Sequence, residues 1–62
     1  MNIEKKFMNV KELSEYLRIS KYTIYYWVSQ KQIPHTKFRK LVRFDMNEIG
    51  KWIDQGQIET LN

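Results

Sequence analysis

Three tyrosines, Tyr22, Tyr25 and Tyr26, lie within a five-residue stretch of this 62-residue chain. The apolar residues of the same stretch recur at the spacing i, i+3, i+4 that marks one face of a helix: Ile24, Trp27 and Val28. A helix here would bury that apolar face and hold the three tyrosines on the opposite side. Phenol hydroxyls donate and accept hydrogen bonds, and the rings make apolar contacts. This face is therefore suited to contacting another molecule.

Four cations follow within a seven-residue stretch: Lys37, Arg39, Lys40 and Arg43. They alternate roughly with apolar residues, which predicts a short β-hairpin over 36–38 and 41–44, with Arg39 and Lys40 at its tip. The formal net charge of the whole chain is +4 and its pI is about 9.5. A basic chain favours a polyanionic partner such as nucleic acid. A solvated strand edge that discourages aggregation is the alternative interpretation of the same cations.

Other kinds of chemistry lack the residues that they need. The single histidine, His35, cannot form a metal site alone, and no serine and acid are spaced to form a triad with it. Cysteine is absent, and the two glycines are too few for a phosphate-binding loop. The apolar runs are too short for a membrane span or a signal peptide. The lack of cysteine fits a reducing cytoplasm, which is where we expect the protein. We expect no catalysis, no cofactor, no metal and no small-molecule substrate.

Three residues have the surroundings of a helix N-cap, namely Asn9, Ser20 and Asp45. Each follows an apolar residue and precedes another four positions later, which is the spacing of a hydrophobic staple. Asn9 and Asp45 also have a glutamate three residues on, as in a capping box. Gly56 is suited to ending the last helix. The pattern predicts helices at three ranges: 10–17, 21–31 and 46–55.

These elements make one small domain at 8–55, between a loose basic arm at 1–7 and a tail at 56–62. The hairpin at 36–44 forms a wing between the second and third helices. Ser14 is small where the second helix would cross the first. The apolar helix faces predict the core: Val10, Leu13, Tyr16, Leu17, Ile24, Trp27, Val28, Ile49, Trp52 and Ile53.

Several short motifs occur in a fixed order between Met8 and Ile53. They are Asn9 to Leu17, Ile19-Ser20, Thr23-Ile24-Tyr25, Ile33-Pro34, Val42-Arg43-Phe44 and Trp52-Ile53. In order and spacing this stretch resembles the excisionase-like, MerR-like winged helix-turn-helix family, found in phage and transposon excisionases and prophage-type regulators. The resemblance implies a mainly α, winged helix-turn-helix fold that binds double-stranded DNA. The second helix would enter the major groove, with the wing against the adjacent minor groove or phosphates.

The resemblance implies contacts to DNA from the outer face of the second helix and from the wing: Lys21, Tyr22, Tyr25, Tyr26, Lys37, Arg39, Lys40 and Arg43. Ser20 and Thr23, which flank the helix face, complete the candidate set. Arg18 stands where the family often has a small turn residue, and Arg39 where it has a glycine at the wing tip. Position 26 is commonly basic in the family and is tyrosine here.

We therefore expect a sequence-specific DNA-binding protein, either an excisionase-type recombination directionality factor or a small transcriptional regulator. A tyrosine recombinase (integrase) would be the protein partner of an excisionase. A monomer of this size contacts only a short stretch of DNA, so we also expect cooperative self-association on repeated sites. The alternative is a protein-interaction module that docks through the tyrosine face, with Ile58 and Leu61 adding contacts. RNA binding is a third option, although it would favour aromatic residues on a sheet.

Overall fold

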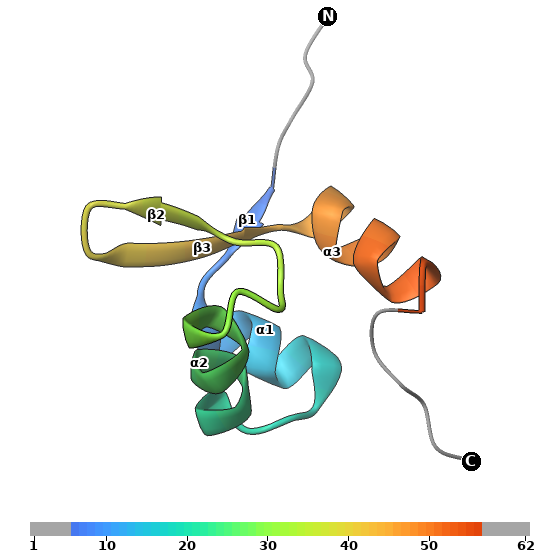
Figure 1. Ribbon diagram of the computed structural model, residues 1–62, viewed down its shortest axis with the longest axis horizontal. Helices are drawn as coiled ribbons and strands as arrows, with labels where there is room; N and C mark the ends of the chain where they lie inside the picture. The colour runs from blue at the N-terminus through green and yellow to red at the C-terminus, as the bar shows by residue number, and fades with distance from the viewer. Residues whose placement is uncertain (1–5, 57–62) are drawn as a thin grey trace, which may run out of the picture.

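The computed structural model describes residues 6–56, which contain three helices and three short strands (Figure 1). In chain order these are β1 (Phe7–Met8), α1 (Val10–Leu17), α2 (Lys21–Ser29), β2 (Thr36–Phe38), β3 (Leu41–Asp45) and α3 (Met46–Asp54). The predicted fold class, three helices with a hairpin wing between the second and third, is confirmed. The predicted second helix extended two residues beyond the end of α2, and the predicted third helix extended one residue beyond the end of α3. Most of the expected arm, and the tail with Ile58 and Leu61, lie outside the described residues.

β1 is a strand that the sequence analysis missed. It pairs antiparallel with β3, so that Phe7 lies opposite Asp45 and Met8 opposite Phe44. The Met46 N–H extends this pairing by donating to the Lys6 carbonyl over 3.0 Å. The sheet therefore has three strands in the order β1-β3-β2, with β3 at its centre. Phe7, which was expected to belong to a loose arm, is part of the sheet.

The three predicted N-caps are all present. The Asn9 side chain accepts from the Glu12 N–H over 2.7 Å, and the Glu12 carboxylate accepts from the Asn9 N–H over 2.9 Å, which completes a capping box. The Ser20 and Asp45 side chains accept one backbone N–H each from the first turns of α2 and α3. The second predicted box is wrong, because the Glu48 carboxylate lies 4.0 Å from the Lys51 ammonium, one turn along α3, and Asp45 caps alone.

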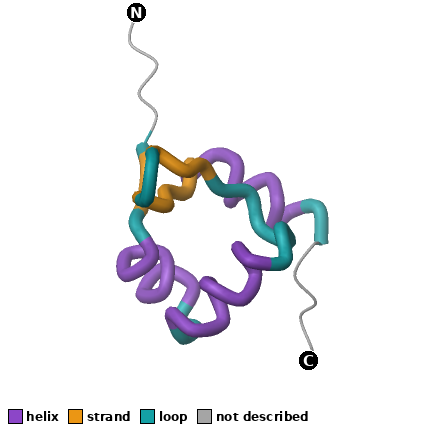
Figure 2. The backbone as a smooth tube through the Cα atoms, turned by 60° about the vertical axis from the view of Figure 1, so that its left-hand side comes forward, coloured by secondary structure: helices purple, strands orange, loops and turns teal. Residues whose placement is uncertain are grey.

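The core is formed where the helices meet the sheet. Its most deeply buried side chains, Leu13, Ile24, Phe44 and Ile49, are fully buried. Each of these is one member of a predicted staple, and the partner apolar residues before the caps also pack in the core. In Figure 2 the strands lie together on one side, and the helices and loops complete the outline of the domain. The apolar pairs that start each helix therefore hold the helix to the core.

Two residues of the predicted core are exposed. The side chain of Tyr16 is 60% exposed and that of Ile53 is 37% exposed. Both lie at the edge of an apolar helix face that the other elements of residues 6–56 do not cover. Trp27 and Leu17 pack against the core but are only partly buried. Phe44, Met8 and Ile33 take their place in the buried set.

Within residues 6–56, three residues other than glycine have a left-handed backbone: Arg18, Lys31 and Arg39, with φ of 59°, 56° and 61°. Glycine is preferred in this conformation because it has no Cβ. Arg18 and Arg39 are two of the three positions at which the sequence departs from the pattern that it resembles, so the structure keeps the backbone that a smaller residue would favour. Gly56, with φ of 74°, ends α3 as predicted, and its N–H donates to the Ile53 carbonyl.

Candidate nucleic-acid interface

The turn between α1 and α2 sets the direction of α2. The Arg18 and Ile19 N–H groups both donate to the Ser14 carbonyl, and the Ser14 hydroxyl donates to the Ile19 carbonyl over 2.8 Å. Arg18 and Ile19 lie four and five positions after Ser14, so the bond from Ile19 closes the end of α1 into a tight turn. Ser20 then starts α2 at once as its N-cap. The two helices consequently leave the turn in a fixed relative orientation.

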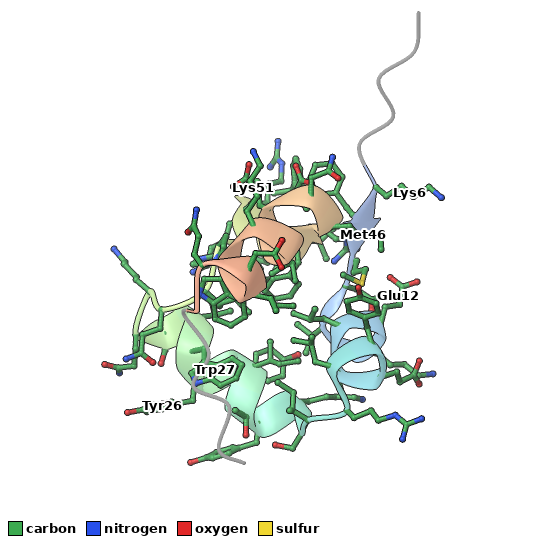
Figure 3. All side chains as sticks on the ribbon, turned by 90° about the vertical axis from the view of Figure 1, so that its right-hand side faces the viewer. Lys6, Glu12, Tyr26, Trp27, Met46 and Lys51 are labelled. Atoms are coloured by element: carbon green, nitrogen blue, oxygen red, sulfur yellow. The ribbon has the colours of Figure 1, made fainter. Side chains whose placement is uncertain are left out.

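The three tyrosines lie on the exposed side of α2. Tyr22 is 80% exposed, and Tyr25 and Tyr26 are 55% and 53% exposed. Figure 3 shows Tyr26 pointing away from the domain, whereas its neighbour Trp27 points inward. The Trp27 ring meets that of Trp52 edge-on, with centroids 5.6 Å apart. This packing fixes the rotation of α2 about its axis, so the tyrosines remain outside.

The small hydroxyl residues beside the tyrosines bond within the helix. The Ser20 oxygen accepts from the Thr23 N–H over 3.1 Å and lies 3.0 Å from the Thr23 hydroxyl. The Ser29 hydroxyl donates to the Tyr26 carbonyl. Ser20 and Thr23 were predicted to contact DNA, and the structure gives both a capping role. The tyrosine hydroxyls are the more available groups on this face.

The wing is the hairpin formed by β2 and β3. Its register places Thr36 opposite Arg43, Lys37 opposite Val42, and Phe38 opposite Leu41. Lys37, Arg39 and Lys40 are exposed, whereas Arg43 is partly buried and donates to the Val42 carbonyl over 2.8 Å. Phe38 and Leu41 are also exposed, and the Phe38 ring meets Phe7 edge-on at 5.8 Å. The wing thus combines cations with an exposed aromatic face that the sequence analysis did not single out.

A cleft of about 290 Å³ lies between the wing and the starts of the two helices. Lys21 and Tyr25, one turn apart on α2, line it on one side, and Lys40 and Arg43 of the wing line it on another. The start of α1 closes it with Asn9, Val10 and Lys11. We refer to this site as the basic cleft. Among the described residues that line it, four are cations and none is an acid.

The basic cleft brings together four of the ten predicted residues and leaves the others around it. Tyr22, Tyr26, Lys37 and Arg39 do not line it, nor do Ser20 and Thr23. Lys11 lines the cleft but was not predicted. Its position in the first turn of α1 looks like that of any exposed helix residue, and only the tertiary arrangement brings it beside the wing. No feature of the sequence alone could have separated it from the other lysines.

Comparison with protein families decides what kind of domain this is. A family model described as a helix-turn-helix domain, which represents an excisionase-like DNA-binding family, matches residues 7–58. The chain belongs to this helix-turn-helix family. Searches of curated proteins and of solved structures gave no match. The matched range covers every described helix and strand, so the resemblance recognised in the sequence is confirmed.

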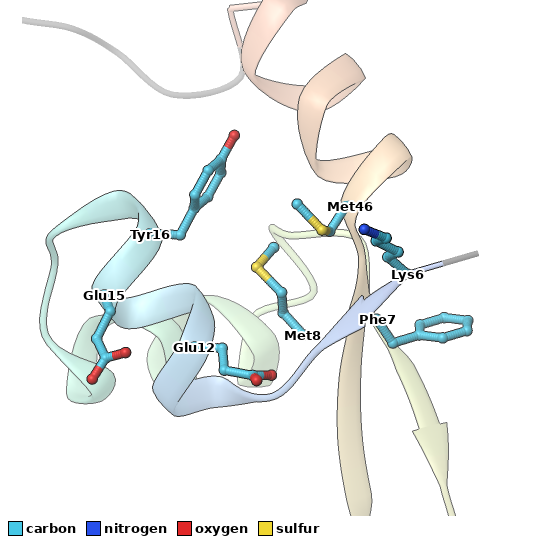
Figure 4. A pocket seen from close by; sticks show the side chains of 7 residues that line it. All are labelled: Lys6, Phe7, Met8, Glu12, Glu15, Tyr16 and Met46. Carbon is cyan, nitrogen blue, oxygen red and sulfur yellow. The ribbon is translucent and has the colours of Figure 1, made fainter. Parts of the chain in front are cut away.

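The helix-turn-helix domain has a second depression on the other side of α1 (Figure 4). This groove is lined by two acids, Glu12 and Glu15, by one cation, Lys6, and by four apolar or aromatic residues: Phe7, Met8, Tyr16 and Met46. Its carboxylates would repel a phosphate backbone. α1 therefore separates a side that carries acids from the side that carries the basic cleft.

The described residues offer no other site that would suggest a different chemistry. Within residues 6–56, no three potential metal-ligating residues come together. The His35 ring nitrogen lies 2.8 Å from the Ile33 carbonyl, which ties the histidine to its own loop. No helix in the same range is long and apolar enough to cross a membrane.

Proposed function

We propose that this chain is a sequence-specific double-stranded DNA-binding protein that reads the major groove with α2. The observation that carries the proposal is the basic cleft, in which Lys21 and Tyr25 of α2 lie beside Lys40 and Arg43 of the wing. Base-reading and phosphate-binding groups must meet the duplex from the same side to act together. An exposed helix with polar side chains fits the width of the major groove.

The tyrosine face would provide the base contacts. Tyr22 and Tyr26 lie directly opposite the buried Ile24 and Val28, so they would enter the groove most deeply. Their hydroxyls can bond to base edges, and their rings can pack on a thymine methyl group. Tyr25, on the flank of α2 beside the wing, would lie nearer to the DNA backbone.

The wing would anchor the domain without reading sequence. Lys37, Arg39, Lys40 and Arg43 meet phosphates or the adjacent minor groove in this proposal. Contacts of this type fix register and raise affinity for every sequence alike. They also release counterions, which makes the binding dependent on salt.

In the cell we propose that the protein acts as an excisionase-type recombination directionality factor or as a small transcriptional regulator. A tyrosine recombinase (integrase) would be the protein partner in the first case. Cooperative self-association on repeated sites would compensate for the small contact area of one domain. Reconstituted excision, with and without this protein, distinguishes the two roles if a recombinase gene lies beside its own.

Fluorescence anisotropy with a labelled duplex across a salt series tests DNA binding directly. If about four to six cations contact phosphates, the log–log slope of affinity against salt should be about −4 to −5. A flat response, or no binding at low ionic strength, would contradict the proposal. The second candidate, a protein-docking module that uses the exposed tyrosines of α2, would then be favoured.

A further inference from the structure

Lys11 places a third element against the DNA-binding side of the domain. It lies in the first turn of α1 and lines the basic cleft together with Lys21 of α2 and Lys40 of the wing. These residues come from three separate parts of the sequence. A ligand held between them would contact α1, α2 and the wing at once.

The backbone at the start of α1 is already partly satisfied. The Asn9 and Glu12 N–H groups both donate within the capping box. Asn9 also has its side-chain oxygen bonded, so neither half of the box is available to a ligand. The long, exposed side chain of Lys11 adds a charged donor at this helix start that can bind an anion.

The charges of the basic cleft are not neutralised by the protein. Among residues 6–56, the one ion pair within 4.0 Å joins Lys51 to Glu48 on α3, outside the cleft. The nearest acids along α1, Glu12 and Glu15, line the groove on its other side. Cations that share a small cleft repel one another until an anion enters. The cleft, of about 290 Å³, is at the lower limit of ligand pockets and suits a group of phosphodiester size.

We propose that the basic cleft binds one phosphate of the DNA backbone, held jointly by Lys11, Lys21 and Lys40. This inference rests on the proposed function and adds Lys11 to the residues that contact DNA. The bound phosphate fixes the wing, α1 and α2 at one point of the backbone and so sets the register in which α2 enters the groove. Lys11 is a positioning residue, because it contacts no base.

Methylphosphonate scanning tests this arrangement. Each duplex in the series carries one uncharged methylphosphonate in place of a phosphate, and its affinity for the protein is measured by anisotropy. Neutralising the phosphate held in the cleft should lower the affinity of the unmodified protein for the duplex about tenfold, as expected for one charge-assisted contact. With Lys11→Gln, the same neutralisation should have little further effect. Lys21→Gln and Lys40→Gln should lose sensitivity at that same phosphate.

Lys51→Gln is the matched control, since it removes the same charge from an exposed position of α3 outside the cleft. It should keep the full pattern of sensitivity, and Lys11→Arg should restore the pattern lost in Lys11→Gln. Lys11→Gln should also reduce the magnitude of the salt slope by about 0.9 and leave the ratio of specific to random affinity unchanged. Should Lys11→Gln fail to fold, Lys11→Ala replaces it: loss of sensitivity at that phosphate supports the contact, and full sensitivity there opposes it.

Three results would overturn the inference while leaving the proposed function intact. In the first, Lys11→Gln behaves like Lys51→Gln. In the second, the three lysine variants lose sensitivity at different phosphates, which would mean separate contacts in place of one shared site. In the third, Lys11→Gln changes sequence preference. By contrast, failure of the unmodified protein to bind any duplex at low salt would contradict the proposed function itself.

Discussion

Arg18 and Arg39 allow a matched pair of substitutions that separates stability from DNA binding. Both have a left-handed backbone, with φ of 59° and 61°. A side chain in this conformation costs roughly 1–2 kcal/mol, and a glycine loses about 0.5–1 kcal/mol more conformational entropy on folding. Arg18→Gly and Arg39→Gly should therefore each stabilise the fold by about 0.5–1 kcal/mol. Because 1 kcal/mol corresponds to about 4–8 °C in a domain of this size, each Tm should rise by about 2–8 °C.

The two variants should differ in their affinity for DNA. Arg39 lies at the tip of the wing, whereas Arg18 lies at the turn between α1 and α2 and belongs to no proposed contact. Arg39→Gly should lose one phosphate contact and reduce the magnitude of the salt slope by about 0.9. Arg18→Gly should leave the slope unchanged although it removes the same charge. Thermal melting by circular dichroism and anisotropy across a salt series measure the two effects.

A fall in Tm in both variants would refute the reasoning on backbone conformation. An equal change in salt slope would show that the loss of net charge alone, and not the position of Arg39, weakens binding. If only Arg39→Gly lowered the Tm, the arginine side chain at the wing tip would have a stabilising contact that outweighs its backbone cost.

Three further substitutions test the core, a helix cap and the tyrosine face. Phe44→Ala, at the fully buried centre of the sheet, should cost roughly 3–5 kcal/mol, and urea unfolding should find the variant largely unfolded in buffer. Asn9→Ala removes its half of the capping box and should cost about 1 kcal/mol, seen as a lower urea midpoint with an unchanged m-value. Tyr26→Ala and Tyr22→Ala should each shrink the affinity gap between a selected site and random duplex by about 1–3 kcal/mol. An unchanged gap in both tyrosine variants, measured by competition anisotropy, would exclude base contacts by this face.

The helices of this domain were predictable because their signals are local. The N-caps at Asn9, Ser20 and Asp45 lie next to the apolar pairs that hold each helix to the core, so a window of six residues contains both. The hairpin was predictable from the alternation of cations and apolar residues around Arg39 and Lys40. Both kinds of signal depend on neighbours in the sequence and not on the rest of the fold.

The features that the sequence did not reveal depend on distant partners. A two-residue strand such as β1 has no pattern of its own, and Met8 is held because Phe44 lies opposite it. Tyr16 continues an apolar helix face, but whether it is buried depends on the position of α3 in the folded domain. Lys11 became a candidate only when the wing was found beside it. Each of these facts concerns residues that are more than 25 positions apart in the chain.

The central position of β3 has a consequence for the order in which the chain can fold as it is synthesised. β1 is made first, but its pairing partner is made only after both helices and β2. Until Phe44 and Ile49 have been added, α1 and α2 lack the surface on which Leu13 and Ile24 are buried. The helix pair would therefore remain loosely associated on the ribosome, since short helices are stabilised mainly by tertiary packing. The domain can close only after β3 and α3 have been made, when its first strand is joined to one of its last elements.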